Sequence, residues 1–494
     1  MTLRCLTLLT VLLTSLLVRP AVAQTNTLSA GPLAHVFPLT LQPGERFETL
    51  GPLFYRQHSA SNTLWAIPPL IARTTDNDPD IDMTEMDILY PLISYDRFGA
   101  EYRFHILQVF SFSGGRTLDK DVDKDRFTLF PFYFQQRSPD TNHNYTAFFP
   151  FYGTLKNRLF RDEIFFVAFP LYGQSRKRDV VTDNFVYPFF HLRKGDGLKG
   201  WQFWPLFGHE FKGMTTKTNG FGEVEPVPAH DKWFALWPFY HHNDLMLGTD
   251  NPQKIRILLP VYSIYRSPLR DSTTYLWPFF TYTDDREKKY HEYGLPWPLI
   301  VFARGEGKTV NRVWPLFGQA HNQYKRSDFY LWPIWKYNST KSAPLDRERT
   351  RILFFLYSDL IERNTETGRA FQRTDLWPLF TARKDLEGRE RFQLFAPLEP
   401  MLPNNKSIER SWSPLWSVWR SEKNPKTEAS SQSLLWNLYR HDKSPAQTKY
   451  SLLFGLFQYQ STPEARQYRL FYIPLGKRAN GPKPAVQEGV TAKP

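Results

Sequence analysis

The sequence predicts an all-β fold, a repetitive antiparallel sheet of about two dozen strands or hairpins that is closed as a barrel-like array. Three observations favour this fold. A proline flanked by aromatic and aliphatic residues, as in Leu276–Phe280 (Leu-Trp-Pro-Phe-Phe), recurs along the chain at steps of about 20 residues. Most copies of this proline motif contain Trp, Phe or Tyr, which suit a pleated sheet. Polar stretches such as 284–287 and 304–307 separate the copies and have the composition of turns.

Proline in each copy argues against long helices, because it removes an amide donor and clashes with the preceding turn at a cost of about 3 kcal/mol. The residue before each proline is held in extended geometry. The close copies are centred on Pro205, Pro238, Pro278, Pro315, Pro333 and Pro378. Looser copies surround Pro38, Pro52, Pro69, Pro91, Pro131, Pro150, Pro170, Pro188, Pro260, Pro298, Pro397, Pro414 and Pro474.

Two arrangements of the motif remain open. Either a strand of about ten residues runs through the proline with a bulge, or the proline ends one short strand and begins the next, so that each repeat is a hairpin with its apolar base at a common hub. Strand alternation would place Leu276, Pro278 and Phe280 on one face and Trp277 and Phe279 on the other. We therefore expect both faces to be apolar at the motif, and the aromatic residues to form a large core.

The domain organisation follows from composition. Residues 1–23 have the basic start, apolar run and Ala-x-Ala end of a secretory signal peptide, and 24–34 are a polar leader. Residues 35–475 are predicted to form a single β-repeat domain, interrupted by an inserted loop at 208–232, and 476–494 a disordered tail.

Compartment and membrane contact can also be inferred. The one cysteine, Cys5, lies in the expected signal, so disulfide and thiol chemistry are not expected in the exported chain. No apolar run after residue 23 is long enough for a membrane-spanning helix, and membrane association is expected through β structure only. The predicted location is the outer membrane or periplasm, or the medium if the protein is secreted.

The formal net charge of +13 favours an anionic partner. Much of this charge lies in the polar stretches, as in Arg176–Arg178. An exported protein meets anionic envelope lipid or polysaccharide, and nucleic acid is not expected. A solvated rim that keeps an aromatic-rich protein soluble is the simpler interpretation.

The sequence gives no positive sign of catalysis. It contains no phosphate-binding glycine loop, no G-x-S-x-G elbow and no H-E-x-x-H zinc motif, so no catalytic, cofactor-binding or metal-binding residue is assigned. The densest histidine group is His241–Asp244, with His209 and His230 at the borders of the inserted loop. Metal binding would need these ligands to converge in the fold.

Two acidic ladders, Asp76 to Asp82 and Asp119 to Asp125, place an aspartate at every second position. This spacing resembles the first half of an EF-hand loop, but Ile81 stands where that loop needs glycine for its sharp turn. Calcium binding and a solvated loop both remain open.

Taken together, the sequence predicts a non-enzymatic exported β-repeat protein of the bacterial-type cell envelope. With about 20 residues per strand and turn and about two dozen strands, the predicted protein resembles outer-membrane β-barrels in general layout. The alternative is a secreted or periplasmic glycan-binding module that stacks aromatic side chains on sugar rings.

Overall fold

The computed structural model describes residues 33–78, 80–115 and 124–479. The expected signal peptide at 1–23, most of the polar leader and the aspartates from Asp119 to Asp123 lie outside these residues. In the described part the protein is all-β, with 43 strands in one antiparallel sheet and two in a separate hairpin. The all-β prediction is confirmed.

The strands are short, because each proline motif and each polar stretch ends one. The first nineteen are β1 (His35–Pro38), β2 (Gly44–Thr49), β3 (Phe54–Ser59), β4 (Asn62–Ile67), β5 (Ile71–Asp76), β6 (Met83–Ile88), β7 (Ile93–Phe98), β8 (Glu101–Ile106), β9 (Phe110–Gly114), β10 (Asp125–Leu129), β11 (Tyr133–Arg137), β12 (Tyr145–Phe148), β13 (Tyr152–Arg158), β14 (Arg161–Val167), β15 (Tyr172–Lys177), β16 (Val180–Phe185), β17 (Phe190–Gly195), β18 (Leu198–Phe203) and β19 (Phe207–Lys212). The separate hairpin consists of β20 (Thr215–Thr218) and β21 (Val224–Val227).

The main sheet continues after this hairpin. Its later strands are β22 (Ala229–Ala235), β23 (Tyr240–Leu247), β24 (Gln253–Leu258), β25 (Tyr262–Arg266), β26 (Arg270–Tyr275), β27 (Phe280–Asp285), β28 (Tyr290–Gly294), β29 (Ile300–Gly305), β30 (Thr309–Val313), β31 (Phe317–His321), β32 (Lys325–Tyr330), β33 (Trp335–Ser342), β34 (Leu345–Ile352), β35 (Tyr357–Asn364), β36 (Ala370–Leu376), β37 (Phe380–Lys384), β38 (Glu390–Leu394), β39 (Trp419–Asn424), β40 (Ala429–Leu434), β41 (Tyr439–Lys443), β42 (Thr448–Leu452), β43 (Phe457–Ser461), β44 (Ala465–Leu470) and β45 (Ile473–Ala479). The short helices are α2 (Lys406–Ser411), α3 (Ser413–Trp416) and the 3-10 turns η2 (Gly51–Leu53), η3 (Thr141–His143) and η4 (Leu453–Gly455).

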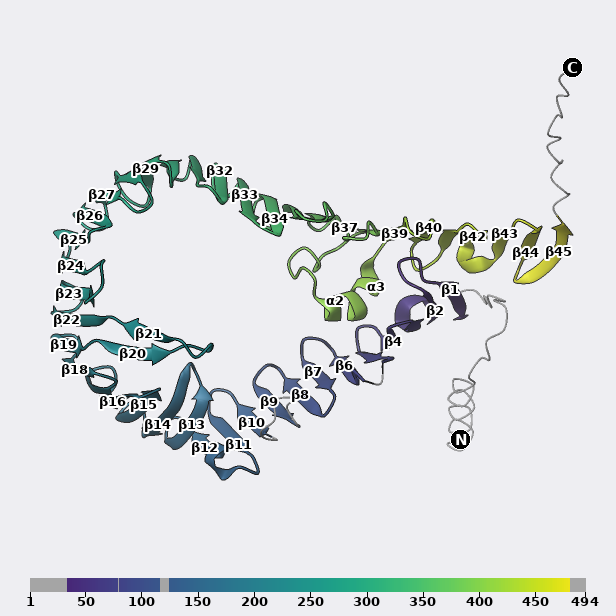
Figure 1. The fold of residues 1–494 in the computed structure, drawn as a ribbon. Helices are drawn as coiled ribbons and strands as arrows, with labels where there is room; N and C mark the ends of the chain where they lie inside the picture. Colours follow the sequence, from purple (N-terminus) through teal and green to yellow (C-terminus); the bar gives the residue numbers. More distant parts are fainter. Residues whose placement is uncertain (1–32, 79, 116–123, 480–494) are drawn as a thin grey trace, which may run out of the picture.

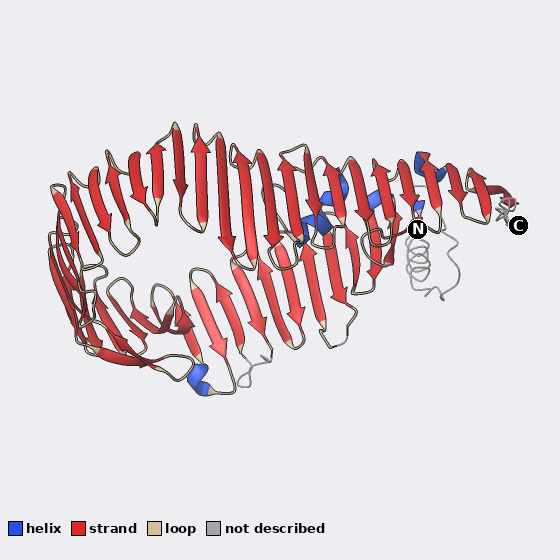
Figure 2. Cartoon of the chain, turned by 45° about the horizontal axis from the view of Figure 1, so that its top comes forward, coloured by secondary structure: helices blue, strands red, loops and turns tan. Residues whose placement is uncertain are grey.

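The sheet is a simple meander, in which each strand pairs with the one before and the one after it (Figure 2). The exception is β19, which pairs with β22 because β20 and β21 form a hairpin inserted between them. The expected inserted loop at 208–232 is therefore a β-hairpin with narrower bounds, since 208–212 and 229–232 belong to strands of the main sheet.

Most copies of the proline motif form hairpin turns that lie on the same edge of the sheet, whereas Pro38 ends β1 at the opposite edge. In the turn between β26 and β27, Tyr275 pairs with Phe280, and the chain reverses through Leu276–Phe279. Leu276 has a φ of 44°, in the left-handed region, and the peptide bond before Pro278 is cis. Of the two expected arrangements, the hairpin is correct, but the apolar bases line a sheet edge and meet at no common hub.

We call this edge the apolar rim. It comprises the turns that join β2 to β3, β4 to β5, and so on by alternate turns to β44 and β45, with β22 following β19. The other edge, which we call the polar edge, carries the remaining turns, such as Arg178-Asp179 and Asp196-Gly197. Because the two kinds of turn alternate along a meander, most of the proline motifs gather on one side.

The sheet curls into an open, ring-like wall, and its first strands lie inside the curve against β38–β41 (Figure 1). This overlap, which we call the seam, is held by side chains. Asn437 donates to Glu48 at 2.6 Å, and Thr40 donates to Ser431 at 2.8 Å. In the described sheet β1 pairs only with β2 and β45 only with β44, so the predicted closure as a barrel-like array is not confirmed.

The helices α2 and α3 lie in the connection between β38 and β39, inside the curve of the sheet (Figure 1). Pro414, which was expected to belong to a strand, is instead at the start of α3. Asn405 caps α2 by accepting a hydrogen bond from the amide of Ile408 at 3.1 Å. The helices fill the seam and bring Arg410 against β6.

The two faces of the wall differ in chemistry. Asp87 on β6 contacts Arg410 of α2, which places Asp87 on the concave face. The residues that pair with Asp87 from strand to strand form a row on the concave face, which we call the concave row. From β6 to β44 its members next to the rim are Asp87, Ser94, His105, Ser111, Thr128, Phe134, Ala147, Gly153, Phe166, Gly173, Asn184, His191, Gln202, Gly208, Phe234, His241, Ile257, Ser263, Thr274, Thr281, Gly294, Val301, Arg312, Gly318, Phe329, Lys336, Arg351, Ser358, Asp375, Thr381, Gln393, Arg420, Ser433, Arg440, Ser451, Gln458 and Arg469.

This concave row is mostly small or polar, so the expectation that both faces are apolar is wrong. The alternation argument failed because the central residues of the motif lie in turns and not in strands. Small side chains on the concave face also suit the curvature. A side chain added at Gly318 would come within 2.2 Å of the Phe329 ring.

Candidate functional site

The most unusual surface of the molecule is the apolar rim, because its side chains are exposed. In the turn between β22 and β23, Leu236 is 60% exposed, Trp237 46% and Phe239 52%. The neighbouring turns have the same character. Contiguous apolar surface of this extent marks an interaction site on a folded protein. The prediction that the motif residues form a buried core is therefore wrong.

The apolar surface continues from the rim onto the convex face. We call the convex-face row next to the rim the aromatic band. From β6 to β27 its members are Ile88, Ile93, Ile106, Phe110, Leu129, Tyr133, Phe148, Tyr152, Val167, Tyr172, Phe185, Phe190, Phe203, Phe207, Ala235, Tyr240, Leu258, Tyr262, Tyr275 and Phe280. From β29 to β45 they are Ile300, Val313, Phe317, Tyr330, Trp335, Ile352, Tyr357, Leu376, Phe380, Leu394, Trp419, Leu434, Tyr439, Leu452, Phe457, Leu470 and Ile473.

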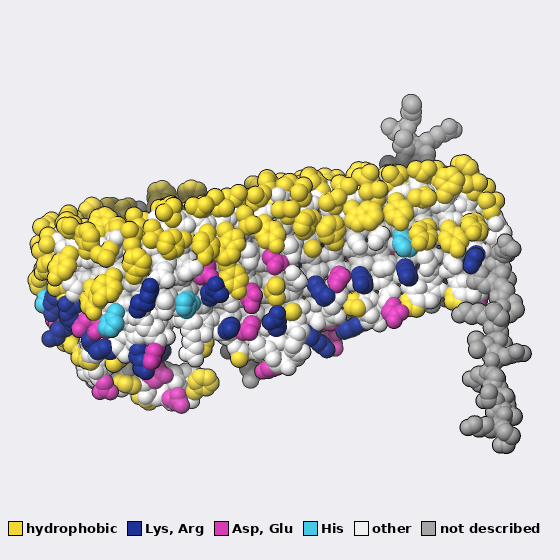
Figure 3. All heavy atoms as spheres, turned by 90° about the horizontal axis from the view of Figure 1, so that it is seen from above, with side chains coloured by type: hydrophobic (Ala, Val, Ile, Leu, Met, Phe, Trp, Pro, Cys, Tyr) yellow, Lys and Arg dark blue, Asp and Glu magenta, His cyan; other side chains and the backbone are white. Residues whose placement is uncertain are grey.

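Figure 3 shows the result on one face of the molecule, where apolar side chains follow one long margin and charged side chains lie toward the other. Every member of the aromatic band is apolar, whereas the concave row is mostly small or polar. The apolar character of the wall therefore changes both from edge to edge and from face to face. The wall is apolar toward the rim and polar toward the opposite edge, and it is more apolar outside than inside.

Aromatic contacts connect neighbouring rim turns. The rings of Trp204 and Trp237 have centroids 5.6 Å apart, and those of Trp314 and Trp332 5.8 Å apart. Such pairs contribute about 0.5–1.5 kcal/mol beyond simple burial. The rim is therefore a packed, continuous surface.

The rim backbone is also hydrogen-bonded from turn to turn. The amides of Leu276 and Trp277 donate to the carbonyls of Val261 and Pro260 in the preceding rim turn, at 2.9 and 2.8 Å. The amide of Trp332 donates in the same way to the carbonyl of Pro315 at 2.7 Å. Because these backbone groups are already paired, few of them would be left without a hydrogen bond if the rim moved out of water.

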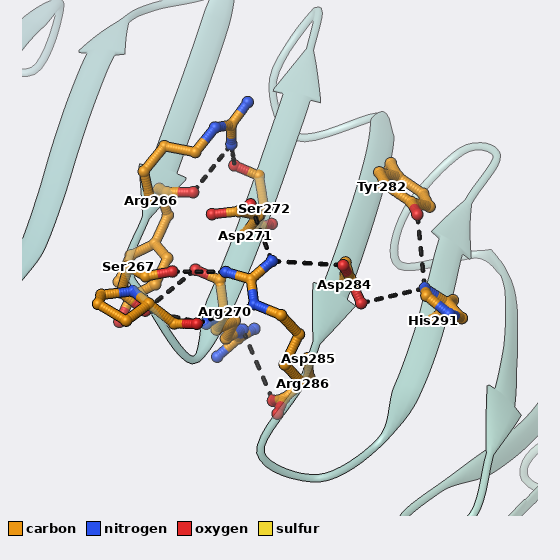
Figure 4. A network of polar contacts seen from close by, with 12 residues as sticks. Arg266, Ser267, Arg270, Asp271, Ser272, Tyr282, Asp284, Asp285, Arg286 and His291 are labelled. Carbon is orange, nitrogen blue, oxygen red and sulfur yellow. Dashed lines mark hydrogen bonds and ion pairs between the residues drawn. The ribbon is translucent and has the colours of Figure 1, made fainter. Parts of the chain in front are cut away.

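Ion pairs cover the convex face near the polar edge. Arg286 contacts Asp271 at 3.1 Å and Asp284 at 3.4 Å, and His291 contacts Asp284 at 3.1 Å (Figure 4). The hydrogen bond from Arg286 lowers the pKa of Asp271 below its usual value. These groups keep the polar edge charged and hydrated at neutral pH. Tyr282 lies between this network and the aromatic band.

The histidines singled out in the sequence do not converge. His241 lies on the concave face and His242 on the convex face, because they are neighbours in β23. His209 pairs with Asp231 at 2.6 Å, and His230 pairs with Glu210 at 2.8 Å. Within the described ranges no group of three or more His, Cys, Asp or Glu residues is placed to hold a metal.

The first acidic ladder forms turns. Asp76 accepts a hydrogen bond from the amide of Asp78 at 2.9 Å, and Asp78 accepts one from the amide of Asp80 at 3.0 Å. Asp82 instead contacts Arg97 at 2.7 Å. These carboxylates are engaged with the backbone and with arginine. Of the second ladder, only Asp125 is described, as the first residue of β10.

No helix in the described part of the chain is long and apolar enough to cross a membrane. Comparison with protein-family models and with curated proteins finds no match for this chain.

Sequence reasoning found the rim residues but placed them in the wrong environment. The signal that could have corrected this was the spacing between the polar stretches and the proline motifs. Each polar stretch lies about ten residues from a motif, which is the length of one short strand with its turn. Each repeat therefore contains two turns, one polar and one apolar. The seam could not be found, because its contacts join residues more than 300 positions apart, such as Asp87 and Arg410.

Proposed function

We propose that this protein is a non-enzymatic, membrane-surface protein of the cell envelope, which inserts its apolar rim and aromatic band into one leaflet of a bilayer. The observation that carries this proposal is the gathering of most proline motifs on a single exposed edge. Exposed leucine, phenylalanine and tryptophan side chains on that edge resemble in composition the faces with which peripheral proteins enter the interface.

The depth of the apolar surface supports attachment to one leaflet. A strand rises about 3.3 Å per residue, so the rim turn and the next two positions extend roughly 10 Å. Interfacial segments enter about 5–10 Å into the headgroup and acyl boundary, whereas the hydrocarbon core is about 30 Å thick. The ion pairs near Arg286 would stay in water.

The energetics also favour stable attachment. Full burial of a Leu, Phe or Trp side chain contributes about 1.5–3 kcal/mol. In the turn between β22 and β23, Leu236, Trp237 and Phe239 are still 60%, 46% and 52% exposed for the membrane to cover. Each turn would then contribute roughly 2 kcal/mol, and a few turns exceed the affinity of a single acyl chain. The expected signal at residues 1–23 would direct the protein to the cell envelope.

Vesicle flotation tests this proposal. Wild-type protein should float with phosphatidylcholine vesicles and remain bound in about 1 M salt, because apolar burial is not weakened by salt. A variant with Leu236→Asp, Trp237→Asp and Phe239→Asp should bind several-fold less well. The matched control is Phe221→Asp in the turn between β20 and β21, where the ring is 93% exposed but remote from the rim.

Two outcomes would contradict the proposal. Release by salt alone would indicate attachment through charge. Failure to float, together with retention on a polysaccharide column that Trp237→Ala abolishes, would favour the glycan-binding alternative.

A further inference from the structure

A polar cavity lies in the seam, between the concave faces of β1–β3 and β37–β41. Its volume is about 330 Å³. Six arginines line it, from both ends of the sheet: Arg46, Arg383, Arg389, Arg391, Arg420 and Arg440. Three carboxylates, those of Glu48, Asp385 and Glu422, also line it. The cavity extends from the polar edge to residues at the rim turns, including Pro52 and Trp436.

Most of these arginines already contact carboxylates. Arg389 lies 2.6 Å from Asp385, Arg440 lies 2.8 Å from Asp442, and Arg391 lies 3.2 Å from Glu409. Arg383 and Glu409 are 3.9 Å apart. These pairs neutralise much of the wall and hold the guanidinium groups in place.

Two arginines keep unused donors. Arg46 is 8% exposed, and its Nε is 2.7 Å from Glu48. Its Nη2 is buried and has no hydrogen-bond acceptor among the described residues. Arg420 donates from Nη2 to Ser417 at 3.1 Å, but its buried Nε has no acceptor in the described chain, and it makes no ion pair there.

A buried cation without a carboxylate is costly unless something else accepts its hydrogen bonds. Burial, with Arg391 and Arg46 nearby, lowers the pKa of Arg420 to about 10. Even so, the group remains charged at neutral pH. Arg46 is paired with Glu48, but its Nη2 and the Nε of Arg420 have no hydrogen-bond acceptor among the described residues.

We propose that this seam cavity binds a phosphate group, held by Arg420 and Arg46. Guanidinium groups bind phosphate oxygens through paired, charge-assisted hydrogen bonds. The cavity is large enough for a phosphate and part of the molecule that carries it. The phosphate can be free in solution or belong to a lipid headgroup, because the cavity reaches the rim. The site does not depend on the membrane role proposed above.

Thermal unfolding of the full chain with inorganic phosphate provides the first test. With ionic strength held constant by sodium chloride, the wild-type Tm should rise by several degrees as phosphate increases, since a ligand that binds only the folded state stabilises it. Arg420→Gln should lose most of this rise. Its Tm without phosphate should be equal to or above that of the wild type, because a half-buried charge that makes no ion pair with the described residues has been removed.

Two further variants control the result. Arg312→Gln, on the same concave row but outside the cavity, should keep the full phosphate response. Arg46→Gln should lose it like Arg420→Gln, because both side chains contribute donors. A variant that loses the phosphate response because it folds poorly would also have a lower Tm without phosphate. Arg420→Gln should not show this lower Tm.

Vesicles distinguish the source of the phosphate. If inorganic phosphate has no effect but phosphatidic acid increases vesicle binding over phosphatidylcholine alone, and Arg420→Gln abolishes only that increase, the ligand is a lipid headgroup. The proposal is overturned if neither probe acts on the wild type, or if Arg420→Gln responds as the wild type does. Binding of all variants to pure phosphatidylcholine vesicles reports separately on the rim.

Discussion

Arg410 joins α2 to β6 and β3 across the seam. It is 7% exposed and contacts Glu85 and Asp87, and its carbonyl accepts a hydrogen bond from Tyr55 at 2.6 Å. Strand pairing cannot hold the two ends of the open sheet together. Side-chain contacts across the seam, among them this buried charge cluster between a helix and a strand, therefore perform this role.

Removing the Arg410 side chain should open the seam. Arg410→Met leaves two carboxylates without their cation, a change that costs about 3–5 kcal/mol when one partner of a buried pair is lost. We expect faster amide exchange in β1–β6, and urea unfolding measures the stability. Arg286→Met at the polar edge, where the pairs are exposed, should cost less than about 1 kcal/mol. Equal effects of the two changes would argue against the seam.

Acid should also loosen the seam through His35. Burial, together with the nearby Arg440 and Lys449, lowers the pKa of His35 from 6.5 to about 3. The unfolded chain then binds more protons than the folded one between these values, so stability falls as the pH drops below about 6.5. The protection factors of the β1 amides, which correct for slower intrinsic exchange in acid, should fall between pH 7 and pH 4.5. His35→Gln should remove the part of this fall that comes from His35, and a variant with the same pH profile as the wild type would contradict the assignment.

At the scale of the element, the rim turns explain what the sequence could predict. Proline, aromatic residues and a regular spacing were enough to predict short strands in a repetitive antiparallel sheet. They were not enough to place the motif in a turn, because turns are usually recognised by glycine, asparagine and aspartate. Here leucine adopts the left-handed conformation, as at Leu276 and Leu331. Neighbouring turns stabilise it through backbone hydrogen bonds that no local pattern reveals.

The hairpin of β20 and β21 should be dispensable for folding. It pairs with itself, and β19 already pairs with β22, with Lys212 opposite His230. Replacing residues 213–228 with a short glycine-rich turn should change the free energy of unfolding by less than about 1 kcal/mol, because loop length has a small effect. Circular dichroism melts would detect the change. Loss of the folded state would mean that the hairpin supports the wall from inside.

At the scale of the whole molecule, the described residues form a single curved layer whose buried apolar residues fall into separate clusters. Its buried apolar clusters are small, as around Tyr55, Ala66 and Ala72. Small concave residues and bulky convex ones follow the same rows over most of the sheet. Sequence reasoning could not assign these rows to faces, because it did not know where each strand ended, and a shift of one residue exchanges the faces.

The orientation of the wall on a bilayer is the central claim, and site-specific fluorescence tests it most directly. Cys5 is the one native cysteine, so single cysteines can be introduced in a Cys5→Ser background. An environment-sensitive probe at Leu236→Cys on the rim should shift to the blue on vesicle binding and be quenched by lipids with a quencher in the acyl chain. The same probe at Asp196→Cys on the polar edge should do neither. Equal quenching at both positions, or binding without quenching at the rim, would contradict the account.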